Sequence, residues 1–198
     1  GKVDFNADYE GNPQQGTIEF METTADFDGK TDLHNGTLAI RMGSRLELEN
    51  LSLTTSSATL AAEGKGNSIT GHVDLAEGST LALTLNGYNA TTAVLVLDGQ
   101  LSVNGYYTLD IHVNGRLSPQ TEYILLELEQ LPYSDNAWNE QNVHVSGDVA
   151  FADLEWQNDY TKLVYRVPTV PEPTTGLLCL SALGVLISRR RRKCEMAD

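Results

Sequence analysis

The sequence predicts an all-β protein whose body is a right-handed β-solenoid. Through residues 36–167, aliphatic side chains alternate with polar ones at a period of two, which is the period of a strand. Glycine-containing pairs that suit tight corners separate these runs. No part of the same segment has an apolar period of 3.6 residues long enough to indicate a helix.

A repeated unit favours the solenoid over other all-β folds. Gly36–Leu48 and Gly71–Leu83 both contain a glycine, two alternating aliphatic residues, a Gly-Ser pair and two more aliphatic residues at identical spacing. A third copy starts at Gly99, with its second glycine one place early. Stacked units of this kind bury one row of side chains on the next. Alternation alone also fits an antiparallel β-sandwich, which is the alternative fold.

The first 35 residues form an N-terminal segment of mixed irregular and β character. Thr17–Glu22 alternates as a strand does, whereas Asp26–Asp32 has the composition of a polar loop. Gly1–Asn6 already has the pattern of a strand interior, and no export signal precedes it. We therefore expect the chain to be a fragment of a longer protein, or else a processed form.

The second half of the body continues with short strands and ends in a hairpin. Strands are expected at Ala93–Leu97, Tyr123–Glu129 and Val143–Val145. The hairpin pairs Ala152–Trp156 with Lys162–Val167 across a turn at residues 157–160. Its bulky side chains, Trp156, Tyr160 and Tyr165, would shield the last open edge from strand addition.

The last thirty residues change character three times. Residues 168–175 form a linker containing Val170, Pro171, Glu172 and Pro173, which is stiff because proline fixes φ and restricts the residue before it. Residues 176–188 are uncharged and mostly apolar, and predict a short transmembrane helix. Residues 189–198 form a basic tail that starts with Arg189, Arg190, Arg191, Arg192 and Lys193.

The apolar segment is short for a membrane span. A helix of residues 174–188 would be roughly 22 Å long, against a hydrocarbon core about 30 Å thick. Arginines that reach back to the headgroups would cover the difference. Because the positive charges follow the helix, we expect the tail in the cytoplasm and residues 1–170 outside it.

This order of linker, apolar segment and basic cluster resembles the PEP-CTERM sorting signal of Gram-negative bacteria. The resemblance covers residues 170–193 and implies that an exosortase, a membrane-embedded cysteine transpeptidase, reads the signal and cleaves near the Pro-Glu-Pro. Such signals usually stop soon after the arginines, whereas Cys194–Asp198 follow here. Residues 36–167 are also similar in pattern to autotransporter-type β-helix passengers, through the repeat and the closing hairpin.

Charge and cysteine content exclude several classes of function. The chain has a formal net charge of −14. All but two of its acidic residues lie within residues 1–175, which hold only eight of the bases. A body this acidic is a poor partner for nucleic acid. The two cysteines, Cys179 and Cys194, both lie in the C-terminal region, so the body has no disulfide, thiol nucleophile or thiolate metal site.

The candidate metal ligands are Asp26, Asp28 and Asp32. Clustered carboxylates with a glycine between them suit a hard cation such as calcium. On the calcium-loop template, however, Asn35 occupies the position of the bidentate glutamate, and no flanking helices are evident. An acidic surface loop is the competing interpretation. We expect no metal and no other cofactor.

No catalytic residue is expected either. The histidines His34, His72, His112 and His144 are far apart in the sequence, and His72 and His112 have the parity of outward-facing strand residues. A stack of strands places outward side chains in rows, so a histidine-lined face is one interpretation, and scattered solvated histidines are the other. No Gly-x-Ser-x-Gly nucleophile elbow is present.

The leading hypothesis is a non-enzymatic structural protein of the cell envelope or surface. It would be held in the membrane during export, processed by an exosortase-type enzyme and delivered to the cell surface or an extracellular polysaccharide. One alternative is a carbohydrate-binding or carbohydrate-cleaving module on the same solenoid, and another is a passenger fragment of an adhesin. Converging carboxylates with exposed aromatics would favour the carbohydrate module. A smooth Thr/Ser/Asn face would favour the structural role.

Overall fold

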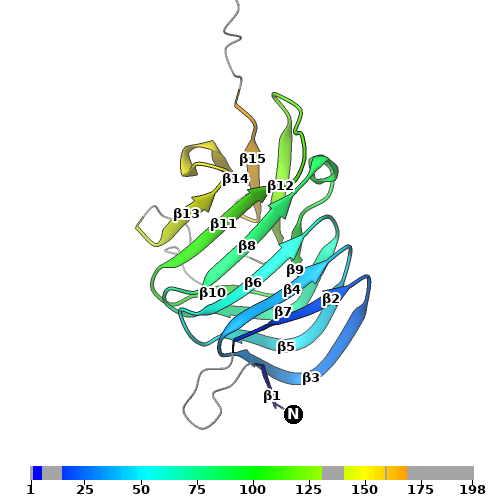
Figure 1. The fold of residues 1–198 in the computed structure, drawn as a ribbon, viewed down its shortest axis with the longest axis vertical. Coiled ribbons are helices and arrows are strands. Elements are labelled where there is room, and N and C mark those ends of the chain that lie inside the picture. Colours follow the sequence, from blue (N-terminus) through cyan, green and yellow to red (C-terminus); the bar gives the residue numbers. More distant parts are fainter. Residues whose placement is uncertain (1, 6–14, 131–140, 159, 169–198) are drawn as a thin grey trace, which may run out of the picture. The chain divides into compact units, whose positions relative to one another are not determined.

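The computed structural model describes residues 2–5, 15–130, 141–158 and 160–168. The chain divides into one unit of Gly1–Pro168 and a second of Thr169–Asp198, and every described residue lies in the first. Within the described residues this body is predominantly β-sheet and contains no α-helix, as predicted (Figure 1). Apart from Pro168, the predicted linker, transmembrane helix and basic tail lie outside the described residues.

The strands form two sheets. The first sheet contains β1 (Lys2–Phe5), β3 (Thr24–Leu33), β5 (Arg45–Leu53), β7 (Asn67–Leu75), β9 (Leu95–Leu97), β10 (Leu101–Val103), β12 (Glu122–Leu128), β14 (Leu154–Gln157) and β15 (Lys162–Arg166). The second sheet contains β2 (Thr17–Met21), β4 (Gly36–Arg41), β6 (Ala58–Glu63), β8 (Thr80–Leu85), β11 (Tyr107–Val113) and β13 (Val143–Gly147). Two short 3-10 helices, η1 (Gly87–Ala90) and η2 (Phe151–Asp153), lie in the connections.

Successive strands alternate between the two sheets. From β2 to β9, each strand is followed by one in the opposite sheet and pairs in parallel with the strand two places further along the chain. We call one passage through both sheets a rung. The register carries a column of threonines through the second sheet: Thr17 pairs with Thr37, Thr37 with Thr59, Thr59 with Thr80 and Thr80 with Thr108.

The core lies between the sheets and consists mainly of leucine and isoleucine. Alternate residues of a strand point to the same side, so each rung contributes the same inward positions. Leu38, Leu60, Leu81 and Leu109 are in register on neighbouring strands, and each is at most 1% exposed. Burial of a leucine side chain stabilises the fold by about 1.5–3 kcal/mol, so these rows hold the rungs together.

A buried asparagine ties three rungs together at a corner of the body. The Asn67 side chain accepts a hydrogen bond from the Gly43 N–H at 3.0 Å and donates to the carbonyls of Glu63 at 2.9 Å and Val94 at 3.0 Å. Gly43, Asn67 and Val94 lie on successive rungs. The side chain is fully buried, so it satisfies backbone groups that water does not reach at this corner.

The repeat of the structure differs in phase from the repeat predicted from sequence. Gly71–Leu83 and the copy from Gly99 are equivalent, because Val73 pairs with Leu101 and Leu83 with Ile111. Gly36–Leu48, however, runs from β4 to β5, in the opposite order of sheets to Gly71–Leu83, which runs from β7 to β8. The partner of Gly36 is Ala58. The predicted equivalence of Gly36–Leu48 and Gly71–Leu83 is therefore wrong, because the two segments are displaced from each other by half a rung.

The same turn chemistry at both ends of a rung explains the error. The Ser44 hydroxyl donates to the carbonyl of Arg41 at 2.7 Å, and the Ser79 hydroxyl donates to the carbonyl of Ala76 at 2.8 Å. Ser44 follows β4 and Ser79 precedes β8, so the two Gly-Ser turns lie at opposite ends of a rung. Because both turns contain the same Gly-Ser pair, the sequence alone does not show which sheet each repeated segment starts in.

Residues 17–35 belong to the same pairing as the rest of the body. β2 pairs with β4 and β3 with β5, so the structure has no change of organisation at residue 36. Asp26–Asp32, predicted as a polar loop, lies within β3, and that prediction is wrong. The low strand propensity of Asp and Gly is overridden because Phe27 and Leu33 take inward positions opposite Leu48 and Leu53.

The closing hairpin is confirmed. β14 and β15 pair in antiparallel orientation, with Leu154 opposite Tyr165 and Trp156 opposite Leu163. β15 also pairs antiparallel with β12, so it lies between β12 and β14 rather than at the edge of the sheet. Among the described strands, antiparallel pairing is limited to these two contacts, whereas a β-sandwich requires it throughout. Tyr165 is buried, but Tyr160 is 59% exposed and shields little of the edge.

Candidate functional site

The predicted sorting residues are not placed by the structure. Val170, Pro171, Glu172 and Pro173, and the basic cluster Arg189–Lys193, lie outside the described residues. Among the residues that are described, no helix is both long and apolar enough to cross a bilayer. The apolar segment 176–188 is not among them.

The predicted metal ligands do not form the loop that the calcium template requires. Asp26 and Asp28 are exposed residues of β3, and Asp32 lies further along the same strand. An extended strand does not wrap its side chains around a cation as a calcium loop does. In the described part of the chain, the residues that do lie within ligand distance of one another are Asp4, Asp32 and His34.

A lysine fills the centre of that cluster. β1 pairs with β3 so that Asp4 lies opposite Asp32, and Lys2 Nζ contacts the two carboxylates at 3.0 and 2.8 Å. His34 Nε2 lies 3.1 Å from Asp4 Oδ1. The hydrogen bond to Asp32, then that to Asp4, raises the pKa of Lys2. His34, followed by Lys2, lowers the pKa of Asp4. The cluster thus carries its own cation and joins β1 to β3.

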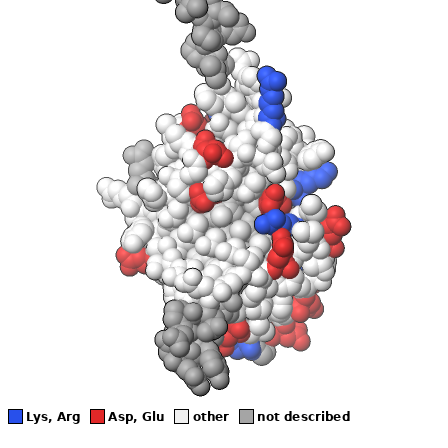
Figure 2. Space-filling model, in the orientation of Figure 1, with Lys and Arg blue, Asp and Glu red and all other residues white. Residues whose placement is uncertain are grey.

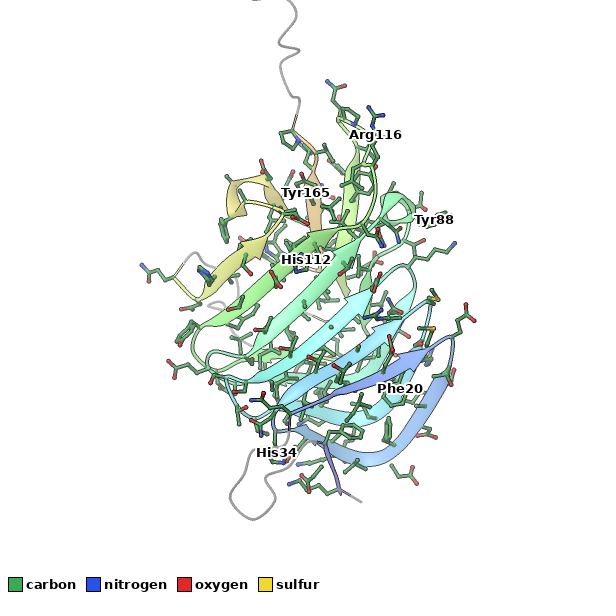
Figure 3. The ribbon with its side chains drawn as sticks, viewed as in Figure 1. Phe20, His34, Tyr88, His112, Arg116 and Tyr165 are labelled. Carbon is green, nitrogen blue, oxygen red and sulfur yellow. The ribbon has the colours of Figure 1, made fainter. Side chains whose placement is uncertain are left out.

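The described histidines do not form one row: His112 of β11 and His144 of β13 are both exposed residues of the second sheet, but the register partner of His144 is Thr108. His72 belongs to β7 in the first sheet and His112 to β11 in the second. Both are exposed, so their predicted outward parity is confirmed. Because they lie on different sheets, they do not form the histidine-lined face that was one interpretation of the sequence. His34 follows β3 near the lower end of the view, whereas His112 lies near the middle (Figure 3). The position in register with His112 on β8 is Thr84.

A serine, an aspartate and a histidine do meet on β11 and β13, but in an unproductive order. Ser146 Oγ donates to Asp110 Oδ1 at 2.6 Å, and His112 Nε2 lies 2.9 Å from Asp110 Oδ2. In a nucleophilic triad the histidine stands between serine and carboxylate, where it removes the serine proton. Here the Asp110 carboxylate lies between the other two groups, and it accepts the hydrogen bond of the Ser146 hydroxyl directly. The arrangement is structural, linking the two strands.

No local sequence pattern pointed to two further charged clusters. Glu122 of β12 contacts Arg166 of β15, and Gln157 Nε2 donates to Glu122 at 3.3 Å. Arg166, followed by Gln157, lowers the pKa of Glu122. Near β9, a hydrogen bond with Asp98 raises the pKa of Glu129. Both clusters join residues more than thirty positions apart, and only the strand order brings them together.

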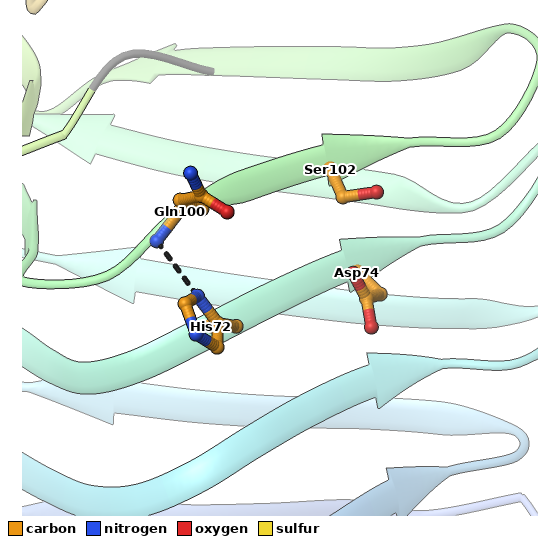
Figure 4. Close-up of a pocket in the computed structure, with 4 residues that line it drawn as sticks. All are labelled: His72, Asp74, Gln100 and Ser102. Carbon is orange, nitrogen blue, oxygen red and sulfur yellow. Dashed lines mark hydrogen bonds between the residues drawn. The ribbon is translucent and has the colours of Figure 1, made fainter. Parts of the chain in front are cut away.

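A shallow polar groove lies on the outer face of the first sheet. It has a volume of about 210 Å³ and is lined by His72 and Asp74 of β7, Ser102 of β10 and Gln100 (Figure 4). Ser102 lies opposite Asp74 in the register of the two strands. The Gln100 N–H donates to His72 Nδ1 at 3.1 Å. The four side chains thus surround one open space with fixed hydrogen-bonding groups.

The outer face of the second sheet has a different character. Its middle strands carry Thr37, Thr59, Thr80 and Thr108 in one column and Ala39, Ala61 and Ala82 in the next, and of these Ala39 is buried. The view in Figure 2 includes a broad area without charged side chains, with acidic and basic residues at its margins. Small uncharged side chains at the strand spacing of about 4.8 Å make this face flat and regular.

Comparison with known proteins finds one likeness. A PEP-CTERM protein-sorting motif matches residues 169–193. This is the segment for which the sequence predicted such a signal, and that part of the resemblance is confirmed. The motif implies export, membrane-anchored sorting toward the cell surface and processing by an exosortase. No curated protein and no solved structure matches the chain.

Proposed function

We propose that the chain is a non-enzymatic structural protein of the cell surface, delivered there by an exosortase-type system. The observation that carries the proposal is the sorting motif at residues 169–193. In this role Pro171-Glu172-Pro173 presents a stiff, extended segment to the processing enzyme. Residues 176–188 hold the chain in the bilayer, and Arg189–Lys193 keep the tail on the cytoplasmic side.

The proposal includes the fold of the exported body, which we describe as a right-handed β-solenoid similar to autotransporter-type passengers. Its support is the parallel register, in which strands alternate between two sheets and Thr37, Thr59 and Thr80 recur at one position. Parallel crossover connections are nearly always right-handed, which is the reason for the proposed hand. Stacked rungs give an elongated scaffold without needing a cysteine, consistent with the cysteine-free body.

The outward surfaces support a structural role over a catalytic one. The second sheet presents a regular face of threonine and alanine, which is the smooth type of surface expected of a scaffold. The Ser146–Asp110–His112 cluster places its groups in the wrong order for nucleophile activation. A lysine already neutralises the Asp4–Asp32 carboxylates.

The mass of the mature protein tests this proposal. The gene is expressed in a bacterium that has an exosortase, and the product is recovered from the cell envelope for intact mass measurement. Loss of everything after the Pro-Glu-Pro region is expected for the native chain. Glu172→Ala should leave the C-terminus intact, and Glu195→Ala, beyond the basic cluster, should be processed normally. A native product with its full C-terminus would overturn the proposal.

A second candidate function is a carbohydrate-binding module, and the groove on the first sheet favours it. His72, Asp74, Gln100 and Ser102 supply several polar groups around a single open space, as polyol recognition needs. This function is compatible with the first, since a scaffold at the cell surface can also hold an extracellular polysaccharide.

A further inference from the structure

The groove between β7 and β10 contains a histidine whose proton is fixed in position. The Gln100 backbone N–H donates to His72 Nδ1 at 3.1 Å, so this nitrogen carries no proton (Figure 4). A neutral imidazole has its single proton on the other nitrogen, Nε2. The His72 side chain is exposed, so its Nε2–H is a donor held in one orientation and available to a ligand.

The carboxylate of the groove is also held in place. Asp74 Oδ2 accepts a hydrogen bond from Asn50 Nδ2 at 2.9 Å, and Ser52 Oγ lies 3.5 Å from the same oxygen. Both partners come from β5, on the side of β7 away from β10. Asp74 is therefore a preoriented acceptor, standing opposite the Ser102 hydroxyl across the strand register.

We propose that this groove binds one sugar residue of a neutral polysaccharide. A sugar hydroxyl both donates and accepts, so adjacent hydroxyls match an acceptor such as Asp74 beside a donor such as His72 Nε2–H. The amide of Gln100 and the hydroxyl of Ser102 provide both functions at the margin. The volume of about 210 Å³ lies below the roughly 300 Å³ at which drug-sized pockets begin, which suits one ring of a longer chain.

The charges of the groove select against other ligands. None of its four lining residues is a lysine or arginine, and the body is acidic, so anionic polymers gain no partner here. A divalent cation prefers several oxygen ligands with more than one carboxylate, whereas Asp74 is the one carboxylate of the lining. The lining has no Phe, Tyr or Trp ring to stack on a sugar, so affinity for a single chain should be in the millimolar range.

This inference deepens the proposed surface role, because it supplies the partner that a surface scaffold would hold. Its test is independent of sorting. The purified full chain, kept in detergent micelles and labelled with ¹⁵N, is titrated with cellohexaose, laminarihexaose and xylohexaose. A heparin hexasaccharide and Ca²⁺ serve as the anionic and cationic comparisons. At least one neutral oligosaccharide should shift the Gln100 amide resonance saturably, since that N–H reports on His72 directly.

Three variants locate the site. Asp74→Asn keeps an oxygen for Asn50 but removes the charge, and it should weaken binding roughly tenfold. Ser102→Ala should also weaken binding. If the spectrum of Asp74→Asn shows a disturbed fold, Ser102→Ala becomes the variant that tests whether the groove is the binding site. Asp26→Asn changes an exposed carboxylate of β3 in the same sheet and should leave affinity within about twofold.

The inference is overturned by any of three results. These are the absence of a saturable shift with every neutral oligosaccharide, preference for heparin or Ca²⁺, and equal loss of binding in Asp26→Asn and Asp74→Asn. None of these results bears on the mass of the mature protein. A chain that is processed yet binds no sugar would keep the surface role and lose the groove, and a chain that binds sugar yet keeps its C-terminus would do the reverse.

Discussion

Gly71 and Leu48 approach each other so closely that no side chain fits between them. A Cβ atom at Gly71 would lie 2.1 Å from the Leu48 carbonyl oxygen, and Gly71 has a φ of +119°. The contact occurs where the register of β5 and β7 is irregular: Glu47 pairs with Thr70 and Asn50 with His72, so two residues of β5 face one of β7. The chain bends here, and His72 follows directly. This glycine therefore sets both the bend and the position of one wall of the groove.

Gly71→Ala should lower the free energy of unfolding by about 2–4 kcal/mol, combining overpacking with the cost of a positive φ. Gly66→Ala is the matched control, because Gly66 also has a positive φ of +73° but no atom lies within 4 Å of its Cβ position. The control should lose only about 1 kcal/mol. Urea denaturation followed by circular dichroism measures both, and equal losses would show that the close approach to Leu48 is not what requires glycine.

Asn67→Ala should destabilise the body by about 2–4 kcal/mol. The change removes one acceptor and two donors from a fully buried corner and leaves the Gly43 N–H and two carbonyls without these partners. Ser68→Ala, at the next residue on the outward side, should change the free energy of unfolding by less than about 0.5 kcal/mol. Urea denaturation compares the two variants. A loss in Asn67→Ala no larger than that in Ser68→Ala would contradict the role of the corner asparagine.

Acid should weaken the two carboxylate clusters. Asp4 and Glu122 have pKa values below their ordinary 3.8 and 4.5, so the folded state holds these protons less tightly than the unfolded state. Their contribution is complete above those ordinary values and is lost as pH falls below them through the folded pKa. The Tm should therefore drop in this range, and less so in the double variant Asp4→Asn, Glu122→Gln. High salt should reduce the difference, because both groups are exposed. Identical Tm–pH curves for variant and native chain would refute the assignment.

Alkaline pH should act through Tyr107. Burial raises the pKa of this phenol well above the ordinary 10.0, so the unfolded state ionises first and stability falls as pH rises beyond that value. Ultraviolet absorbance at the phenolate band should show the Tyr107 phenol ionising only together with unfolding. Tyr107→Phe should move alkaline unfolding to higher pH. Reversible ionisation of Tyr107 in the folded chain would disagree with this account.

The strands could be predicted because their evidence is local. Alternation at period two located the runs around Tyr123–Leu128 and Lys162–Arg166 directly, since inward and outward residues differ in type. The phase of the rungs could not be found in the same way, because Ser44 and Ser79 close turns of identical chemistry at opposite ends of a rung. The threonine column from Thr17 to Thr108 carried the correct phase, but its intervals are unequal.

The candidate site depends on contacts that no local pattern contains. His72 and Gln100 are 28 residues apart, and they meet because β10 pairs with the second half of β7. The alternation pattern predicted that His72 faces outward, but it did not predict that Gln100 lies beside it. Asp26 and Asp28 do not lie in the predicted loop for a related reason. Their composition suggested a loop, whereas the partner strand β5 holds them extended. The C-terminal motif was accessible from sequence because its signal is a linear order of residue types.

The placement of β15 has a mechanical consequence. This is the final strand before the C-terminal unit, and it is hydrogen-bonded to β12 on one edge and to β14 on the other. A pulling force transmitted from a tethered C-terminus would therefore act on a strand that is paired on both edges. Removing this strand from the sheet requires breaking the hydrogen bonds to two neighbouring strands rather than to one. A body attached through this strand would resist shear at its point of attachment better than one that ended in a peripheral strand.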